Sequence, residues 1–170
     1  MKPQAISGVS AGVETEITTE YPSVASTAVG RFFGAIYESI PLRINGIKLS
    51  HLLFPLPTSP IALLVYLYLK VAGRRYRLTN RAVQVWSMLG QRLYGQVPLG
   101  DIREIDIEQS GGQVFYKAAD LVLRGADGRP LLRLEGVPRA EVFQQTILEA
   151  RDARSQVESS LARIQARQPA

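Results

Sequence analysis

The stretch RYRLTNRAVQVW, residues 75–86, decides the fold that the sequence predicts. Its apolar residues Tyr76 and Leu78 alternate with arginines, which is the two-residue period of a β-strand with one apolar and one basic face. The Asn80-Arg81 pair suits a tight turn, and valines resume the alternation after it. The stretch therefore predicts an antiparallel hairpin.

Further short strands are predicted after this hairpin, with no helix between them. The predicted strands are 93–97, 99–107, 114–116, 121–123 and 131–135, with a loop at 109–113. Consecutive short strands separated by turns are typical of an antiparallel sheet, sandwich or barrel. The stripe Phe143, Ile147 and Ala150 then predicts one amphipathic helix that closes an end of the sheet.

The chain before the hairpin divides into three parts. Residues 1–22 sustain no apolar period, so we expect a mobile tail. In residues 23–41 an apolar residue recurs every fourth position, which predicts an amphipathic helix that ends at Pro41. This helix packs either on the protein's own core or in a membrane interface.

The third part, residues 47–73, is predicted to be a hydrophobic membrane-associated segment. Twenty-one residues without charge, 49–69, would cover about 31 Å as a helix, the thickness of a bilayer core. Prolines interrupt this run, so it predicts either a kinked span from Leu49 or a re-entrant hairpin that turns at residues 55–60. The predicted membrane-embedded residues are Leu52, Leu53, Phe54, Ile61, Leu63, Leu64, Val65 and Leu67.

Basic residues gather around this segment. Residues 43–92 contain eight Lys or Arg and no acid. The first five after the apolar run lie directly behind it, where positive charge is retained on the cytoplasmic side and attracts anionic headgroups. A solvated strand face is the alternative interpretation. The predicted headgroup-contacting residues are Lys70, Arg74, Arg75, Arg77 and Arg81.

The order of these elements resembles the bacterial pleckstrin-homology-like (PH-like) domains of membrane proteins. The resemblance covers residues 74–150, and rests on the entry strand 76–83, the segment 97–105 and a helix after Val137-Pro138. It implies a mainly β fold: a bent antiparallel sandwich or open barrel capped by a C-terminal helix, after a helical membrane-associated N-terminal region. Members commonly carry two transmembrane helices before the domain, whereas this chain has one proline-broken segment. The resemblance implies no ligand and no catalytic residue.

Composition argues against catalysis. The absence of cysteine excludes disulfides and thiolate metal sites, and the single histidine, His51, excludes a zinc site with several histidines. No glycine-rich phosphate loop is present. The acids Asp101, Glu104, Asp106 and Asp120 are predicted to form a solvated face. We therefore expect a protein that is not an enzyme and needs no cofactor.

The sequence thus predicts a membrane-anchored PH-like scaffold or adaptor at the cytoplasmic face of a bacterial cytoplasmic membrane, in contact with anionic lipids. Its charged C-terminal helix or tail, residues 151–170, is predicted to be exposed or to pair with a second copy or another protein. The alternative is a soluble binding protein whose apolar segment is core and whose basic strand binds nucleic acid or another acidic partner. The near-neutral charge after residue 92 argues against nucleic acid.

Overall fold

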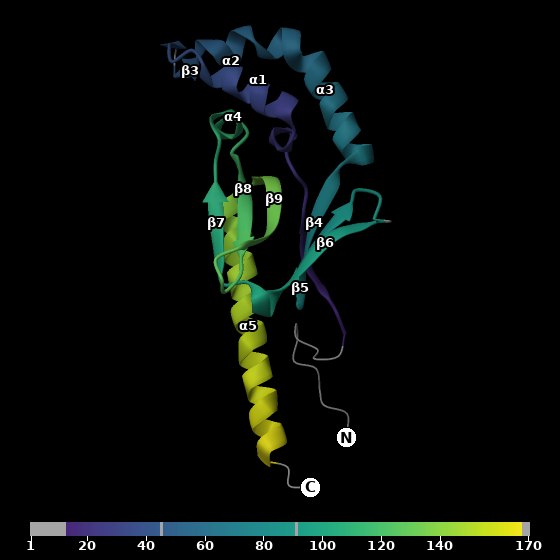
Figure 1. Ribbon diagram of the computed structural model, residues 1–170. Helices are drawn as coiled ribbons and strands as arrows, with labels where there is room; N and C mark the ends of the chain where they lie inside the picture. Colours follow the sequence, from purple (N-terminus) through teal and green to yellow (C-terminus); the bar gives the residue numbers. More distant parts are fainter. Residues whose placement is uncertain (1–12, 45, 91, 168–170) are drawn as a thin grey trace.

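The computed structural model describes residues 13–44, 46–90 and 92–167, in which two antiparallel sheets enclose a shared core (Figure 1). The first sheet has the strand order β1-β4-β5-β6, and the second has the order β7-β8-β9. The helix α5 closes the sandwich, so the predicted antiparallel fold with a C-terminal helix is confirmed. The bounds are β1 Glu16–Glu20, β4 Arg74–Thr79, β5 Ala82–Ser87, β6 Leu93–Pro98, β7 Glu104–Glu108, β8 Ala118–Arg124, β9 Pro130–Pro138 and α5 Ala140–Arg167.

The core is built as the alternation in β4 predicts. Tyr76 and Leu78 are buried, and Arg75 and Arg77, which alternate with them, lie half-exposed on the other face of the sheet. The Tyr76 hydroxyl donates to the Glu135 carbonyl oxygen at 2.8 Å and accepts from the Glu135 amide at 2.9 Å, which joins the two sheets. Burial raises the pKa of this hydroxyl, so it remains protonated.

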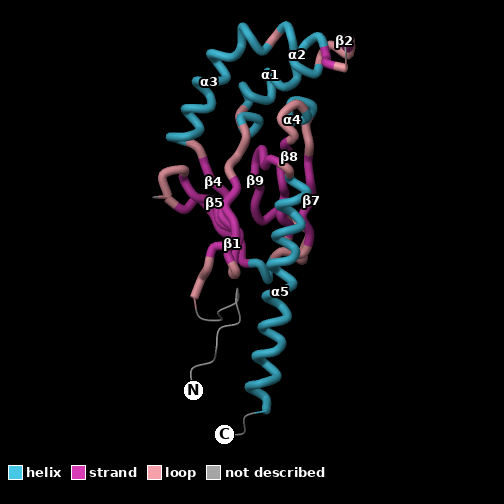
Figure 2. Tube along the Cα trace, turned by 180° about the vertical axis from the view of Figure 1, so that it is seen from behind, coloured by secondary structure: helices cyan, strands magenta, loops and turns pink. Residues whose placement is uncertain are grey.

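Helix α5 packs on the sandwich for only part of its length. Ala140, Phe143 and Ile147 are buried, and Ala150 is packed against the core. The helix then continues without a break to Arg167 and leaves the domain (Figure 2). Its residues 158–164 are exposed to solvent.

The interpretation of residues 1–22 as a mobile tail is wrong for Glu16–Glu20. These residues form β1, an edge strand that pairs antiparallel with β4. Glu16 makes an ion pair with Arg77 at 2.7 Å, and the Thr79 hydroxyl donates to Glu14 at 2.8 Å. The apolar period does not reveal this strand, because Ile17 is its one apolar residue and the others are Glu or Thr. Residues 1–12 lie outside the described ranges.

A helical layer covers one end of the sandwich (Figure 1). The predicted helix at 23–41 corresponds to η1 and α1, and α1 begins after Thr27 because the Thr27 hydroxyl accepts from the Gly30 amide at 3.0 Å. The apolar segment forms α2 and α3, which meet at Phe54. The bounds are η1 Val24–Ser26, α1 Ala28–Glu38, β2 Arg43–Ile44, β3 Ile47–Lys48, α2 Leu49–Leu53 and α3 Pro55–Ala72.

The predicted turn at residues 55–60 is wrong, because α3 runs through them. Pro55 and Pro57 lie in the first turn, where amide groups have no helical partner. Pro60 cannot donate to the Leu56 carbonyl, but the Ser59 hydroxyl does so at 3.1 Å. Neither a re-entrant hairpin at the prolines nor the predicted span is supported. None of the described helices is long and apolar enough to cross a membrane.

A further correction concerns residues 109–116. The predicted loop and the predicted strand 114–116 contain a short helix instead, α4, Gly111–Val114. Ser110 and Gln113 form a capping box in which each side chain binds the other's backbone amide. This S-x-x-Q spacing is typical of a helix start, and an apolar strand pattern does not reveal it.

Close backbone contacts attach the helical layer to the sandwich. A Cβ atom at Gly34 of α1 would lie 2.0 Å from the Gly112 backbone oxygen, and one at Gly112 would lie 2.0 Å from the Arg31 backbone oxygen. Gly136 of β9, at φ +63°, touches Ser26 in the same way. Since only glycine fits at such contacts, the helical layer is an integral part of the fold.

We predict that Gly112→Ala lowers the free energy of unfolding by about 2–3 kcal/mol, because the added methyl group would overlap the α1 backbone. The control is Gly111→Ala in the same short helix, since a Cβ there meets nothing within 4 Å. Urea denaturation of both variants measures the difference. If the two variants were equally stable, the close contact between Gly112 and the α1 backbone would be contradicted.

Candidate functional site

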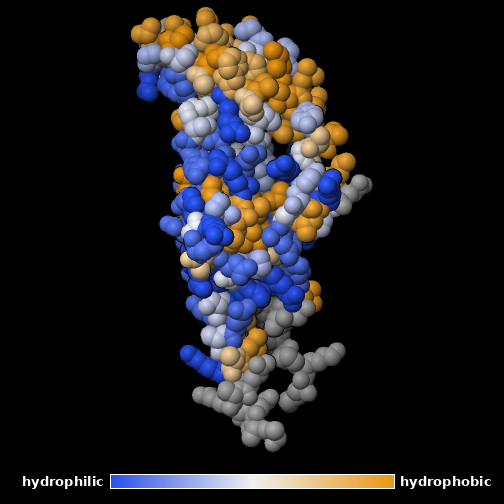
Figure 3. All heavy atoms as spheres, viewed as in Figure 1, coloured by the Kyte–Doolittle hydropathy of each residue, from blue (hydrophilic) through white to orange (hydrophobic). Residues whose placement is uncertain are grey.

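Helix α3 presents an uncharged apolar face to solvent. Thr58, Ala62, Val65 and Leu69 are half-buried at helical spacing and form the side that faces the protein. The opposite side, which we call the outer face of α3, is 51–83% exposed at each residue. It consists of Leu56, Leu63, Leu64, Leu67 and Val71. Apolar atoms gather over the helical layer in Figure 3.

The predicted membrane-embedded residues fall into three groups. Leu53, Ile61, Leu63, Leu64 and Leu67 are exposed, whereas Phe54 and Val65 are half-buried. The side chain of Leu52 lies outside the described part of the structure. The alternative prediction, that the apolar segment is core, is wrong for the exposed residues.

Sequence reasoning missed other exposed apolar residues of the helical layer. Phe32 on α1 is 62% exposed, Leu42 before β2 is 66% exposed and Ile47 on β3 is 51% exposed. Single exposed apolar residues are ordinary, but a contiguous apolar surface marks a site that meets another apolar phase or a partner. The helix patterns could not reveal it, because they do not say which side of a helix is covered.

The five predicted headgroup-contacting residues do not form one cluster. Arg81 lies at the far end of the β4–β5 hairpin, about 17 Å along the strand from Arg74. Arg77 is paired with Glu16. Lys70, Arg74 and Arg75 lie together where α3 passes into β4. The structure therefore separates these three residues from Arg77 and Arg81.

Arg92 joins this end of α3, although it was not among the predicted headgroup-contacting residues. Arg74 pairs in register with Ser87, whose amide donates to the Arg92 carbonyl oxygen at 2.8 Å. The guanidinium groups of Arg74 and Arg92 lie 5.3 and 5.4 Å from the centre of the Tyr94 ring. We call Lys70, Arg74 and Arg92, all exposed, the basic rim.

Asp120 is buried, in contrast to the predicted solvated face. Its side chain is 3% exposed and accepts from the Gly136 amide at 2.8 Å, from Arg133 at 2.7 Å and from Gln113 at 2.5 Å. Burial raises the pKa of this carboxyl, but the hydrogen bonds from Gly136, Arg133 and Gln113 together lower it below its usual value. Asp120 thus ties α4 to β9 and serves the fold.

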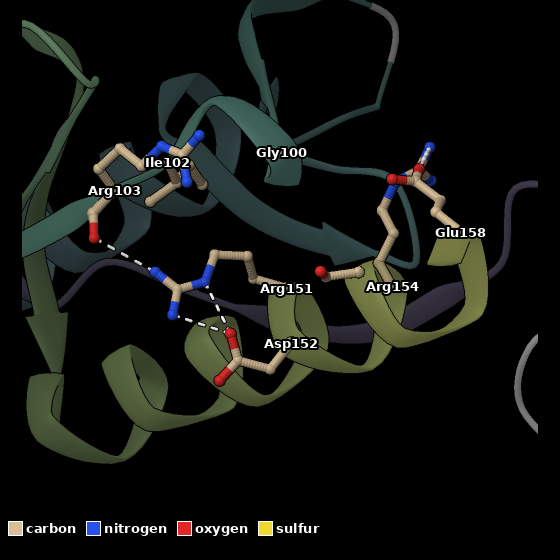
Figure 4. A pocket seen from close by; sticks show the side chains of 8 residues that line it. Gly100, Ile102, Arg103, Arg151, Asp152, Arg154 and Glu158 are labelled. Carbon is tan, nitrogen blue, oxygen red and sulfur yellow. Dashed lines mark hydrogen bonds and ion pairs between the residues drawn. The ribbon is translucent and has the colours of Figure 1, made fainter. Parts of the chain in front are cut away.

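A groove of about 410 Å³ lies between η2 (Leu99–Asp101) and α5, far from the helical layer (Figure 4). Arg151 pairs with Asp152 at 2.8 Å, and Arg154 pairs with Glu158 at 2.8 Å. Because neighbouring acids already compensate both α5 arginines, we assign no ligand to this groove. Among the residues that the structure describes, no group of His, Asp and Glu is placed to hold a metal ion.

The chain belongs to the family described as Bacterial PH domain, whose profile matches residues 24–151. The match begins in η1, so it includes the helical layer and the strands of the sandwich other than β1. A DUF1696 family protein with a pleckstrin-homology domain from Shewanella loihica PV-4 is similar in structure, with a TM-score of 0.34 and 21% identity over 46% of this chain and 70% of that chain. A comparison with curated proteins gives no match.

We predict that the stability of the protein falls on acidification below about pH 4, in part through Asp120. A carboxyl whose pKa is lowered by folding contributes stability above its unfolded pKa, and loses it as the pH falls through the folded pKa. Urea denaturation from pH 7 to pH 3 should therefore give a flatter profile for Asp120→Asn than for the wild type. The exposed-residue control Asp127→Asn should keep the wild-type slope. An unchanged profile for Asp120→Asn would contradict this role.

Proposed function

We propose that this PH domain is a non-catalytic scaffold that docks peripherally on the cytoplasmic face of a bacterial membrane. The outer face of α3 lies in the membrane interface, and the basic rim contacts anionic headgroups. The observation that carries the proposal is the uncharged outer face, with Leu56 83% and Leu64 67% exposed. Such a face, on a helix whose other side packs against the protein, fits an interfacial helix.

Magnitudes decide which term dominates the docking. Burial of one leucine side chain is worth about 1.5–3 kcal/mol, whereas one basic residue near an anionic leaflet is worth about 1 kcal/mol. Five apolar side chains on the outer face therefore outweigh three charges on the basic rim. The apolar face provides affinity, and the rim favours anionic membranes.

The sandwich and α5 are the parts left available for other proteins in this arrangement. Figure 1 places the helical layer at one end of the molecule and the C-terminal part of α5 at the other. Leu161 and Ile164 are 39% and 55% exposed there. Self-association or partner binding through this part of α5 stays a prediction.

We predict that Leu64→Asp combined with Leu67→Asp weakens binding to anionic vesicles at least about a hundredfold, because two apolar contacts are replaced by charges. Cosedimentation of the full chain with phosphatidylglycerol-containing vesicles measures this. The wild type should bind neutral vesicles more weakly than anionic vesicles, because the basic rim contributes nothing there while the outer face of α3 still contributes.

The matched control is Leu131→Asp on β9, which is 42% exposed and lies in the sandwich. It should bind like the wild type, and thermal denaturation should find both variants folded, because all three leucines are exposed. Wild-type binding by the α3 variant, or a wild type that stays in the supernatant with every vesicle, would refute the proposal.

A further inference from the structure

A cleft beneath α3 separates the inner side of this helix from the segment before η1. It encloses about 270 Å³, and its lining is mostly apolar and aromatic, with Tyr21, Tyr66, Leu69 and Met88 among its residues. This volume is slightly below the usual range for small-molecule sites, so it admits part of a hydrocarbon chain but not a whole lipid.

Of the described residues that line this cleft, Lys70 is the one cation, and none is a carboxylate. The Lys70 ammonium lies 5.4 Å from the centre of the Tyr21 ring and 5.5 Å from that of Tyr66. Cation–π contacts at exposed sites are weak, so they hold the ammonium at the cleft without matching a charge-assisted hydrogen bond to phosphate. Lys70 is therefore positioned to exchange its aromatic contacts for an anion.

A second cation lies close by. A neighbouring cavity of about 240 Å³ shares Pro22 and Leu69 with the cleft and is lined by Arg74. Glu135 also lines that cavity, so its charge is partly balanced. The unbalanced positive charge is at Lys70, on the side where the lining is apolar.

We propose that this cleft binds one anionic phospholipid, with the phosphate on Lys70 and part of one acyl chain against Leu69 and Met88. The inference rests on the proposed membrane docking, because Lys70 belongs to the basic rim and also lines the cleft. The cleft would thus bind a single lipid molecule, whereas the outer face of α3 and the basic rim contact many lipids without selecting one. Charge complementarity selects an anion, and the apolar lining selects a lipid over free phosphate.

Methionine provides a probe inside the cleft. The chain has two methionines, Met1 and Met88, and Met88 lines the cleft. Full-length protein labelled with ¹³C at the methionine methyl groups is titrated with dihexanoyl phosphatidylglycerol below its micelle concentration. The Met88 methyl resonance should shift saturably, and the Met1 resonance serves as the reference.

Three variants test the role of Lys70. Lys70→Gln should weaken the lipid affinity about tenfold, because a hydrogen-bonded charge pair is lost. Lys70→Arg keeps the charge and should stay within about threefold of the wild type. The control Lys117→Gln changes another exposed lysine and should leave the titration unchanged.

Two further titrations distinguish the ligand class. An equal Met88 shift with dihexanoyl phosphatidylcholine, or with inorganic phosphate at the same concentrations, would overturn the assignment to an anionic lipid. So would a Met88 resonance that does not respond to phosphatidylglycerol. If the wild type still cosediments with anionic vesicles in that case, the cleft is wrong and the peripheral docking stands. If vesicle binding alone fails, the docking is wrong.

Discussion

The backbone contact between α1 and α4 is the constraint on which the rest of the structure depends. Gly34 and Gly112 bring two chain segments closer than any side chain would permit. Through this contact, and through Gly136 against Ser26, the helical layer is fixed on the sandwich. The layer is therefore not a tether before the domain, which agrees with a family match that begins at residue 24.

A fixed helical layer determines what α3 can do. One side of α3 packs against the protein, so its leucine-rich outer face stays uncovered. The register of β4, β5 and β6 then brings Arg74 and Arg92 to the end of the same helix, around Tyr94. Apolar and cationic groups are adjacent because the strand pairing places them so, and this adjacency is the basis of the proposed docking.

Local patterns predicted the sandwich well and the helical layer poorly. The hairpin at residues 75–85 and the helix α5 can be predicted because their apolar periods lie within one short stretch of sequence. The helix through Pro60 depends on a single hydroxyl, that of Ser59, which satisfies the Leu56 carbonyl. Asp120 is buried only because Gln113, Arg133 and Gly136 converge on it from other elements. Contacts of this kind, like the Gly34–Gly112 contact, join residues from different elements, so a local sequence pattern does not predict them.

The most direct test of the account is the environment of a fluorophore on the outer face of α3. The chain has no cysteine, so Leu67→Cys takes a single NBD label, and Leu131→Cys gives the comparison label on the sandwich. On phosphatidylglycerol-containing vesicles, the label at residue 67 should shift its emission to the blue and be quenched by nitroxide lipids. The label at residue 131 should do neither. Equal responses of the two labels, or no response at residue 67 while the protein cosediments with the vesicles, would contradict the account.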